Sequence, residues 1–130
     1  MYNSVFGDVA FDYGWKTETE ITLWERTFAV TVDADAFYET EGITAEQEAA
    51  FSAFNDQKAE KQRAIESLLM SYYEDRRSEE QLLEQLTPTQ LTFDRKGGCA
   101  LLFTDEDDLD NGLAVTVFPD EDVMTQDEFL

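Results

Sequence analysis

Residues 104–118, TDEDDLDNGLAVTVF, combine clustered carboxylates with an Asn-Gly pair, and such oxygen-bearing side chains can bind calcium. An EF-hand loop needs oxygen ligands at positions 1, 3 and 5, Gly at 6 and Glu at 12. If Asp107 is position 1, Gly112 stands correctly at position 6. Leu109 and Phe118 then stand where oxygen ligands are required, and a start two residues earlier also fails. The EF-hand interpretation is therefore rejected, and weak calcium binding of another kind stays open.

The same segment fits an acidic connection between two antiparallel strands. Asn111-Gly112 favours a tight turn because both residue types readily adopt positive φ. We therefore predict a solvated hairpin loop at this position, with the turn at Asn111-Gly112.

The charge of the chain is its most unusual property. Thirty acidic and nine basic residues give a formal net charge of -21, and residues 98–130 contain ten Asp or Glu and no Lys or Arg. Such charge disfavours direct contact with nucleic acid or membranes and favours a cationic partner. We expect a basic protein partner, such as a toxin or a nucleic-acid-binding protein. The candidate contact residues are Asp105, Glu106, Asp107, Asp108, Asp110, Asp120, Glu121 and Asp122.

Several classes of chemistry are disfavoured by what the chain lacks. It contains no histidine, one cysteine and no glycine-rich phosphate loop. Ser-His-Asp and Cys-His catalysis, zinc sites and common nucleotide sites are therefore not expected. We predict no catalytic residue, no metal and no cofactor. Cys99 lies in an apolar run and is expected to be a buried, inert thiol.

Two alternatives to protein binding stay open. A hydrolase using a pair of carboxylates would need at least one Asp or Glu in a concave pocket with a raised pKa. The charge could also serve solubility alone.

The first third of the chain has the pattern of antiparallel strands. In residues 5–35, apolar and aromatic side chains alternate with polar ones, which is typical of strands with one face in the core. Turns are expected near Gly14 and near Glu25-Arg26, giving a three-stranded meander. Aromatic residues at this spacing are expected mainly in the core, with a ligand-stacking surface as the alternative.

A helical segment is expected over residues 44–86. Thr44 with Gln47, and Ser78 with Gln81, have the spacing of capping boxes, in which two side chains satisfy free amides at a helix start. We predict one long helix from Ala45 to about Arg77 with a polar, exposed middle. A break near residues 58–62 is the fallback. A short second helix should end before Pro88.

The period-two pattern returns in residues 89–129 and predicts three strands and a short fourth. The expected fold is a single α+β domain over residues 1–130. It has an antiparallel sheet of six to seven strands, with the helices against one face, in the order β-β-β-α-α-β-β-β, with a further short strand at the end. The N-terminus has no signal-peptide pattern and no segment is apolar enough to span a bilayer, so we expect a soluble cytoplasmic protein.

Four segments together resemble a family of small acidic bacterial proteins of unknown function: FGDVAFDYGW, the helix ending LLMSYY, LTPTQLTF and GLAVTVFPDEDVMTQDEFL. In that family a YDYGW hairpin begins the domain, an LTPT element leads into the second group of strands, and a TQD motif closes the chain. Its members look like the immunity-protein-type domains found near bacterial secreted toxins. The resemblance implies one domain over almost the whole chain and implies no catalytic residue.

Overall fold

The computed structural model describes residues 2–73, 77–106 and 108–129, with only the backbone path described for residues 108–111. Its main feature is a seven-stranded sheet in the order β3-β4-β5-β6-β7-β8-β9. The strands are β3 (Ala10–Phe11), β4 (Trp15–Leu23), β5 (Arg26–Ala34), β6 (Leu86–Phe93), β7 (Cys99–Asp105), β8 (Asp108–Phe118) and β9 (Asp122–Thr125). Two further short strands, β1 (Tyr2–Asn3) and β2 (Gly7–Asp8), form a separate pair that the sequence did not predict.

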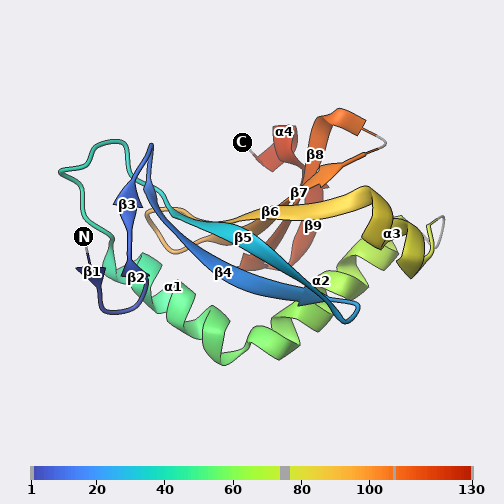
Figure 1. Ribbon diagram of the computed structural model, residues 1–130, viewed down its shortest axis with the longest axis horizontal. Helices are drawn as coiled ribbons and strands as arrows, with labels where there is room; N and C mark the ends of the chain where they lie inside the picture. The colour runs from blue at the N-terminus through green and yellow to red at the C-terminus, as the bar shows by residue number, and fades with distance from the viewer. Residues whose placement is uncertain (1, 74–76, 107, 130) are drawn as a thin grey trace.

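The predicted α+β class is confirmed. Four helices accompany the strands in the described part of the chain: α1 (Ala45–Asp56), α2 (Lys58–Tyr72), α3 (Glu79–Gln85) and α4 (Gln126–Phe129). Figure 1 shows α1 and α2 lying along one face of the sheet. Buried apolar side chains of these helices and of the strands belong to the same core cluster. None of the described helices is both long and apolar enough to cross a lipid bilayer.

One strand pair departs from the predicted antiparallel pattern. β5 and β6 are parallel, with Val32 opposite Leu91 and Ala34 opposite Phe93. A parallel pair needs a long crossover connection, and the helical segment supplies it. This pair joins the N-terminal and C-terminal groups of strands into one sheet.

The N-terminal meander is confirmed with small shifts at its turns. Tyr13 and Gly14, with φ of 56° and 140°, connect β3 to β4. Trp24 and Glu25 connect β4 to β5 with φ of 47° and 66°, as a tight hairpin turn of matching twist requires. Trp15 is buried as expected of a core aromatic, but Tyr13 is 89% exposed.

The prediction of one uninterrupted long helix is wrong. The helix breaks at Gln57, where φ is -109° and ψ is 18°, one residue before the range given as the fallback. Phe54 of α1 and Ile65 of α2 are fully buried in the same core. The bend lets both arms lie against a twisted sheet, which a straight helix cannot follow over that length.

The polar start of α2 contacts the sheet instead of only solvent. β4 is an edge strand beyond its short pairing with β3. The Gln62 side-chain oxygen accepts from the backbone amide of Thr22 at 2.7 Å, and Glu66 accepts from that of Trp24 at 2.6 Å. These contacts satisfy edge amides that could otherwise pair with another chain.

Both predicted capping boxes are present. Thr44 and Gln47 exchange hydrogen bonds of 2.9 and 3.0 Å at the start of α1. The fully buried Gln47 side chain also donates to the carbonyl groups of Asp35 and Phe93, at 3.0 and 3.1 Å. Gln47, which the local sequence identifies as a capping residue, therefore also attaches α1 to the ends of β5 and β6.

The predicted turn at Asn111-Gly112 is wrong. These residues lie inside β8, which begins at Asp108, and Asp108 already pairs with Asp105 of β7, so the two strands are joined before Asn111-Gly112 is reached. Gly112 serves close packing there, because a Cβ atom would collide with the Phe103 carbonyl oxygen and the Gln126 amide nitrogen. The predicted short fourth strand is confirmed as β9, whereas α4 was not expected.

Candidate functional site

One end of the sheet carries four connections. Opposite residues form a continuous row across five strands, from Trp15 through Ala34, Phe93 and Cys99 to Phe118. The chain leaves this row through the turn 12–14, the loop 35–44, the loop 94–98 and the turn 119–121. We call this edge of the molecule the four-loop end.

Exposed acidic residues gather at the four-loop end. Those in or directly beside the four connections are Asp12, Glu39, Asp94, Asp120, Glu121 and Asp122. Of the basic residues nearby, Lys96 is exposed and Arg95 is hydrogen-bonded to the carbonyl groups of Asp35 and Gly42. Lys16 and Lys61 form ion pairs with Asp33 and Glu121. The exposed acidic side chains outnumber these basic ones, so this end is negative.

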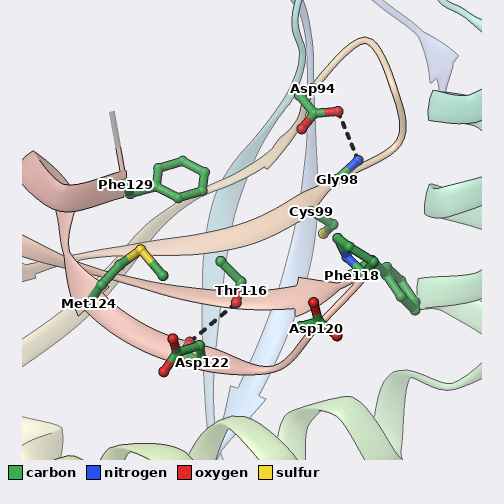
Figure 2. A pocket seen from close by; sticks show the side chains of 10 residues that line it. Asp94, Gly98, Cys99, Thr116, Phe118, Asp120, Asp122, Met124 and Phe129 are labelled. Carbon is green, nitrogen blue, oxygen red and sulfur yellow. Dashed lines mark hydrogen bonds between the residues drawn. The ribbon is translucent and has the colours of Figure 1, made fainter.

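Three of these carboxylates surround an open groove. Figure 2 shows Asp94 on one side of it and Asp120 and Asp122 on the other. The groove has a volume of about 320 Å³. Thr116 and Asp122 are opposite each other on β8 and β9, and the Thr116 hydroxyl contacts the Asp122 carbonyl oxygen at 3.5 Å.

The position of Asp94 is fixed by the loop that follows it. One carboxylate oxygen accepts from the backbone amides of Lys96 and Gly98, at 2.8 and 2.9 Å. A Cβ atom at Gly98 would collide with this carboxylate, so the turn depends on glycine there. These amides hold the Asp94 carboxylate in one place, and no ion pair with it is found among the described residues.

The remaining lining of the groove is largely apolar. Besides Gly98 and Thr116, it consists of Cys99, Phe118, Pro119, Met124 and the α4 residue Phe129. Long basic side chains bury their aliphatic stems on apolar surface and keep their charged heads near polar groups. A groove with an apolar lining and carboxylates on opposite sides is therefore complementary to Lys or Arg side chains.

Lys61 of α2 partly neutralises one neighbour of the groove. Its ammonium group lies 3.6 Å from a Glu121 carboxylate oxygen and 4.7 Å from the centre of the Phe118 ring. Glu121 is thus already paired, whereas Asp120 and Asp122 line the groove. We therefore assign the three groove carboxylates, Asp94, Asp120 and Asp122, as the candidate contact set.

The structure separates the residues that the sequence grouped together. Asp120, Glu121 and Asp122 lie at the four-loop end, but Glu106 and the backbone of Asp108 and Asp110 lie toward the other end of β8. At a rise of about 3.3 Å per residue, the two ends of β8 are roughly 30 Å apart. Asp107 lies outside the described residues. These acidic positions do not form one continuous surface.

Asp105 was predicted to be exposed, and this is wrong. Only 5% of its surface is accessible, and its carboxylate accepts from Arg77 at 3.3 Å and from the Tyr73 hydroxyl at 3.3 Å. The Arg77 guanidinium also stacks over the Tyr73 ring at 4.2 Å. Burial without a cation would be costly, so this carboxylate is held inside by its partners and is not a contact residue.

The carboxylate-pair hydrolase finds little support in the described residues. Asp33 is buried, and its burial raises the pKa of the carboxyl group. However, Asp33 forms an ion pair of 2.9 Å with Lys16 and does not line the groove. Among the residues whose side chains are described, no group of three or more carboxylates or thiols is arranged to hold a metal. The calcium alternative concerned a loop that lies partly outside those residues and stays a prediction.

Sequence reasoning missed Asp94 as a site residue. The segment DRKGG could have indicated it. An Asp followed at a short distance by two glycines favours a turn in which the Asp side chain accepts hydrogen bonds from backbone amides. Nothing in the sequence indicated that this turn would lie beside the turn at 119–121. Their proximity follows from the pairing of Phe93 with Cys99 and of Cys99 with Phe118.

A comparison with protein families found a match over residues 5–95 to a family described as Domain of unknown function (DUF6985). The chain belongs to this family. The matched part of the DUF6985 domain includes the meander, the helical segment and β6, together with Asp94. The predicted membership in a family of unknown function is thus confirmed, while the closing segment GLAVTVFPDEDVMTQDEFL lies beyond the match. Comparisons with curated proteins and with solved structures each found no match.

Proposed function

We propose that this domain is a non-enzymatic binding protein whose partner is a basic protein, contacted through the four-loop end. The observation that carries the proposal is the convergence of Asp94, Asp120 and Asp122 on one apolar-lined groove. Charges arranged in this way steer a cationic partner toward one face and fix its orientation. The net charge of -21 adds a long-range attraction toward the same cationic partner.

In its sharpest form, the partner is a secreted toxin that the domain neutralises inside the bacterial cytoplasm, as an immunity protein does. Nuclease toxins are suitable targets because they bind phosphates through cationic clefts. Mimicry of DNA by the groove carboxylates is a narrower version of the same proposal. Co-expression with a toxin encoded by a neighbouring gene tests this form, and continued killing of the host would contradict it.

The general form can be tested with a basic ribonuclease as a probe and with the same ribonuclease after acetylation of its lysines. We expect the domain to bind the unmodified probe, measured by calorimetry at low and physiological salt, and not the acetylated one. The combined substitutions Asp94→Asn, Asp120→Asn and Asp122→Asn should weaken binding by about tenfold, a loss of about 1.4 kcal/mol.

A matched control variant distinguishes a loss of binding caused by the groove from a loss caused by the change in net charge alone. Glu79→Gln, Glu80→Gln and Glu106→Gln together remove the same charge from exposed positions near the opposite end of the sheet. This variant should bind the probe almost as well as the unchanged domain. Equal losses in the two variants would show that the negative charge acts without a defined site, and the proposal would then be abandoned.

A further inference from the structure

The 35–44 loop at the four-loop end displays two aromatic side chains to solvent. Phe37 is 79% exposed and Tyr38 is 70% exposed. Neither belongs to the core cluster, so neither contributes to the packing that holds the described fold together. Large apolar side chains that remain exposed in adjacent positions are typical of binding surfaces.

The backbone that carries these aromatic residues is held by Glu41. One Glu41 carboxylate oxygen accepts from the backbone amides of both Phe37 and Tyr38, at 2.8 and 3.0 Å. The Glu41 amide in turn donates to the Tyr38 carbonyl oxygen at 2.9 Å. The turn is thus closed on itself by a side chain, and the two rings are directed outward from a defined backbone.

The loop is also attached to the body of the domain at both ends. The Trp15 indole donates to the Glu41 carbonyl oxygen at 2.7 Å. The Arg95 guanidinium donates to the carbonyl groups of Asp35 and Gly42, at 3.1 and 2.7 Å, and Gln47 also donates to that of Asp35. The loop therefore has little conformational freedom left to lose when it binds.

A rigid loop with exposed aromatic side chains has the physical properties of a preformed anchor. Ordering a flexible loop costs affinity, and this loop is already ordered by its hydrogen bonds. Phe and Tyr bury large areas with few rotatable bonds, which is why such residues often dominate binding energy. We propose that Phe37 and Tyr38 insert into an apolar pocket on the basic protein whose cationic side chains occupy the groove.

Charge decides in favour of a basic protein as the occupant. Glu39 within the loop and Asp12 in the turn 12–14 are exposed acidic residues of the same negative four-loop end. A second copy of the chain would bring a like charge to the contact, and an anionic lipid surface would be repelled. A partner with an apolar pocket and a basic rim satisfies both the aromatic rings and the surrounding carboxylates. This inference rests on the proposed function.

The hairpin beside the loop strengthens the assignment. Tyr13 is 89% exposed and has φ of 56°, a conformation that is uncommon for a bulky residue. A Cβ atom at the adjacent Gly14 would collide with the Asp33 carboxylate, so the tip fits closely onto the sheet. Trp15, directly after this tip, is the residue that donates to Glu41. Tyr13 is thus displayed from a second rigid element at the same end.

Two synthetic peptides of equal length and equal charge test the aromatic anchor. One consists of Lys and Leu, and the other consists of Lys and Ser. We expect the unchanged domain to bind the Lys-Leu peptide about tenfold more tightly, since an anchor residue contributes at least this factor. Phe37→Ala with Tyr38→Ala should abolish the preference and leave affinity for the Lys-Ser peptide unchanged. The combined substitutions Asp94→Asn, Asp120→Asn and Asp122→Asn should weaken the binding of both peptides equally.

Tyr2→Ala is the matched control, since Tyr2 is 73% exposed but lies on β1, outside the loop. It should keep the preference for the Lys-Leu peptide. A preference that survives in the Phe37→Ala, Tyr38→Ala variant, or that Tyr2→Ala also abolishes, would overturn the inference. A domain with no preference overturns it too, while the proposed function still holds if both peptides bind through the groove.

Two further measurements distinguish other occupants of the loop. Sedimentation that shows a dimer in the unchanged domain and a monomer after Phe37→Ala and Tyr38→Ala would assign the loop to a second copy. Binding to phosphatidylcholine vesicles that depends on the same two residues would assign it to a membrane. Either result would contradict the inference. If neither peptide binds at low salt, the proposed function itself fails.

Discussion

Arg77 reaches a carboxylate oxygen of Asp105 at 3.3 Å, although the two residues come from the segment before α3 and from the end of β7. Both side chains are largely buried, and the Tyr73 hydroxyl donates to the other oxygen of the same carboxylate. This contact closes the corner at which the helical segment returns to the sheet. It makes Asp105 a structural residue within an acidic segment that otherwise looks uniform.

Asp105→Ala should therefore destabilise the domain. Removing one partner of a buried ion pair leaves the other charge without compensation, and we expect a loss of about 3 kcal/mol in the free energy of unfolding. Urea denaturation measures it directly. Glu106→Ala, at the adjacent exposed position, removes the same charge and should change stability by no more than about 0.5 kcal/mol. Similar effects of both substitutions would mean that the buried pair is not structural.

Gly112→Ala tests whether close packing, and not a turn, explains that glycine. The new Cβ atom would displace the Phe103 carbonyl oxygen or the Gln126 side chain, which donates to that oxygen at 2.8 Å and holds α4. Overpacking of this kind should cost about 1–3 kcal/mol. Gly42→Ala is the control, since no atom lies within 4 Å of its added Cβ atom. Thermal denaturation of both variants measures the difference in their loss of stability.

Gln47→Ala should be among the more damaging single substitutions of a polar residue. It removes the capping partner of Thr44 and leaves the buried carbonyl groups of Asp35 and Phe93 without this donor. A lost cap costs about 1 kcal/mol, and each further hydrogen bond lost costs about 0.5–1.5 kcal/mol, since Arg95 and the Asp35 amide still donate to these two carbonyl groups. Gln81→Ala removes the corresponding residue of the exposed second capping box and should cost only the smaller amount. Equal losses, measured by denaturation with urea, would contradict the buried role of Gln47.

Stability should fall at alkaline pH in a way that depends on Cys99. Burial raises the pKa of this thiol above its ordinary value of 9.0. Because the folded state holds the proton more tightly, the contribution of Cys99 is complete below pH 9.0 and is lost as pH rises toward the folded-state value. Cys99→Ala should show a shallower decline above that pH, at some cost in packing. Slow reaction of the native thiol with an alkylating reagent provides a second check, and rapid reaction would contradict the burial.

The patterns that were read correctly from the sequence depend on neighbours along the chain. The capping boxes of Thr44 and Ser78 involve residues three apart, and strand alternation in 15–34 needs only a period of two. Each of these interactions is complete within a few residues. The α+β class, the meander and the order of the main elements could therefore be predicted, whereas the β1–β2 pair and α4 were not.

Burial and neighbourhood in space could not be predicted, because both depend on distant segments. The bend at Gln57 follows from the twist of a sheet that includes strands from both ends of the chain. Asp105 is buried because Arg77 and Tyr73 meet it, and nothing in its own segment distinguishes it from Glu106.

The candidate site likewise depends partly on properties evident from the sequence and partly on contacts between distant segments. Net charge and its concentration near the C-terminus were evident from composition, and they already favoured a cationic partner. Strand pairing then placed Asp94 across the groove from Asp120 and placed Glu106 near the opposite end of β8. Long-range hydrogen bonds from Trp15 and Arg95 fixed the loop that exposes Phe37 and Tyr38. Local sequence thus specified the elements and the sign of the charge, and the pairing of remote strands specified where that charge and those aromatic rings come together.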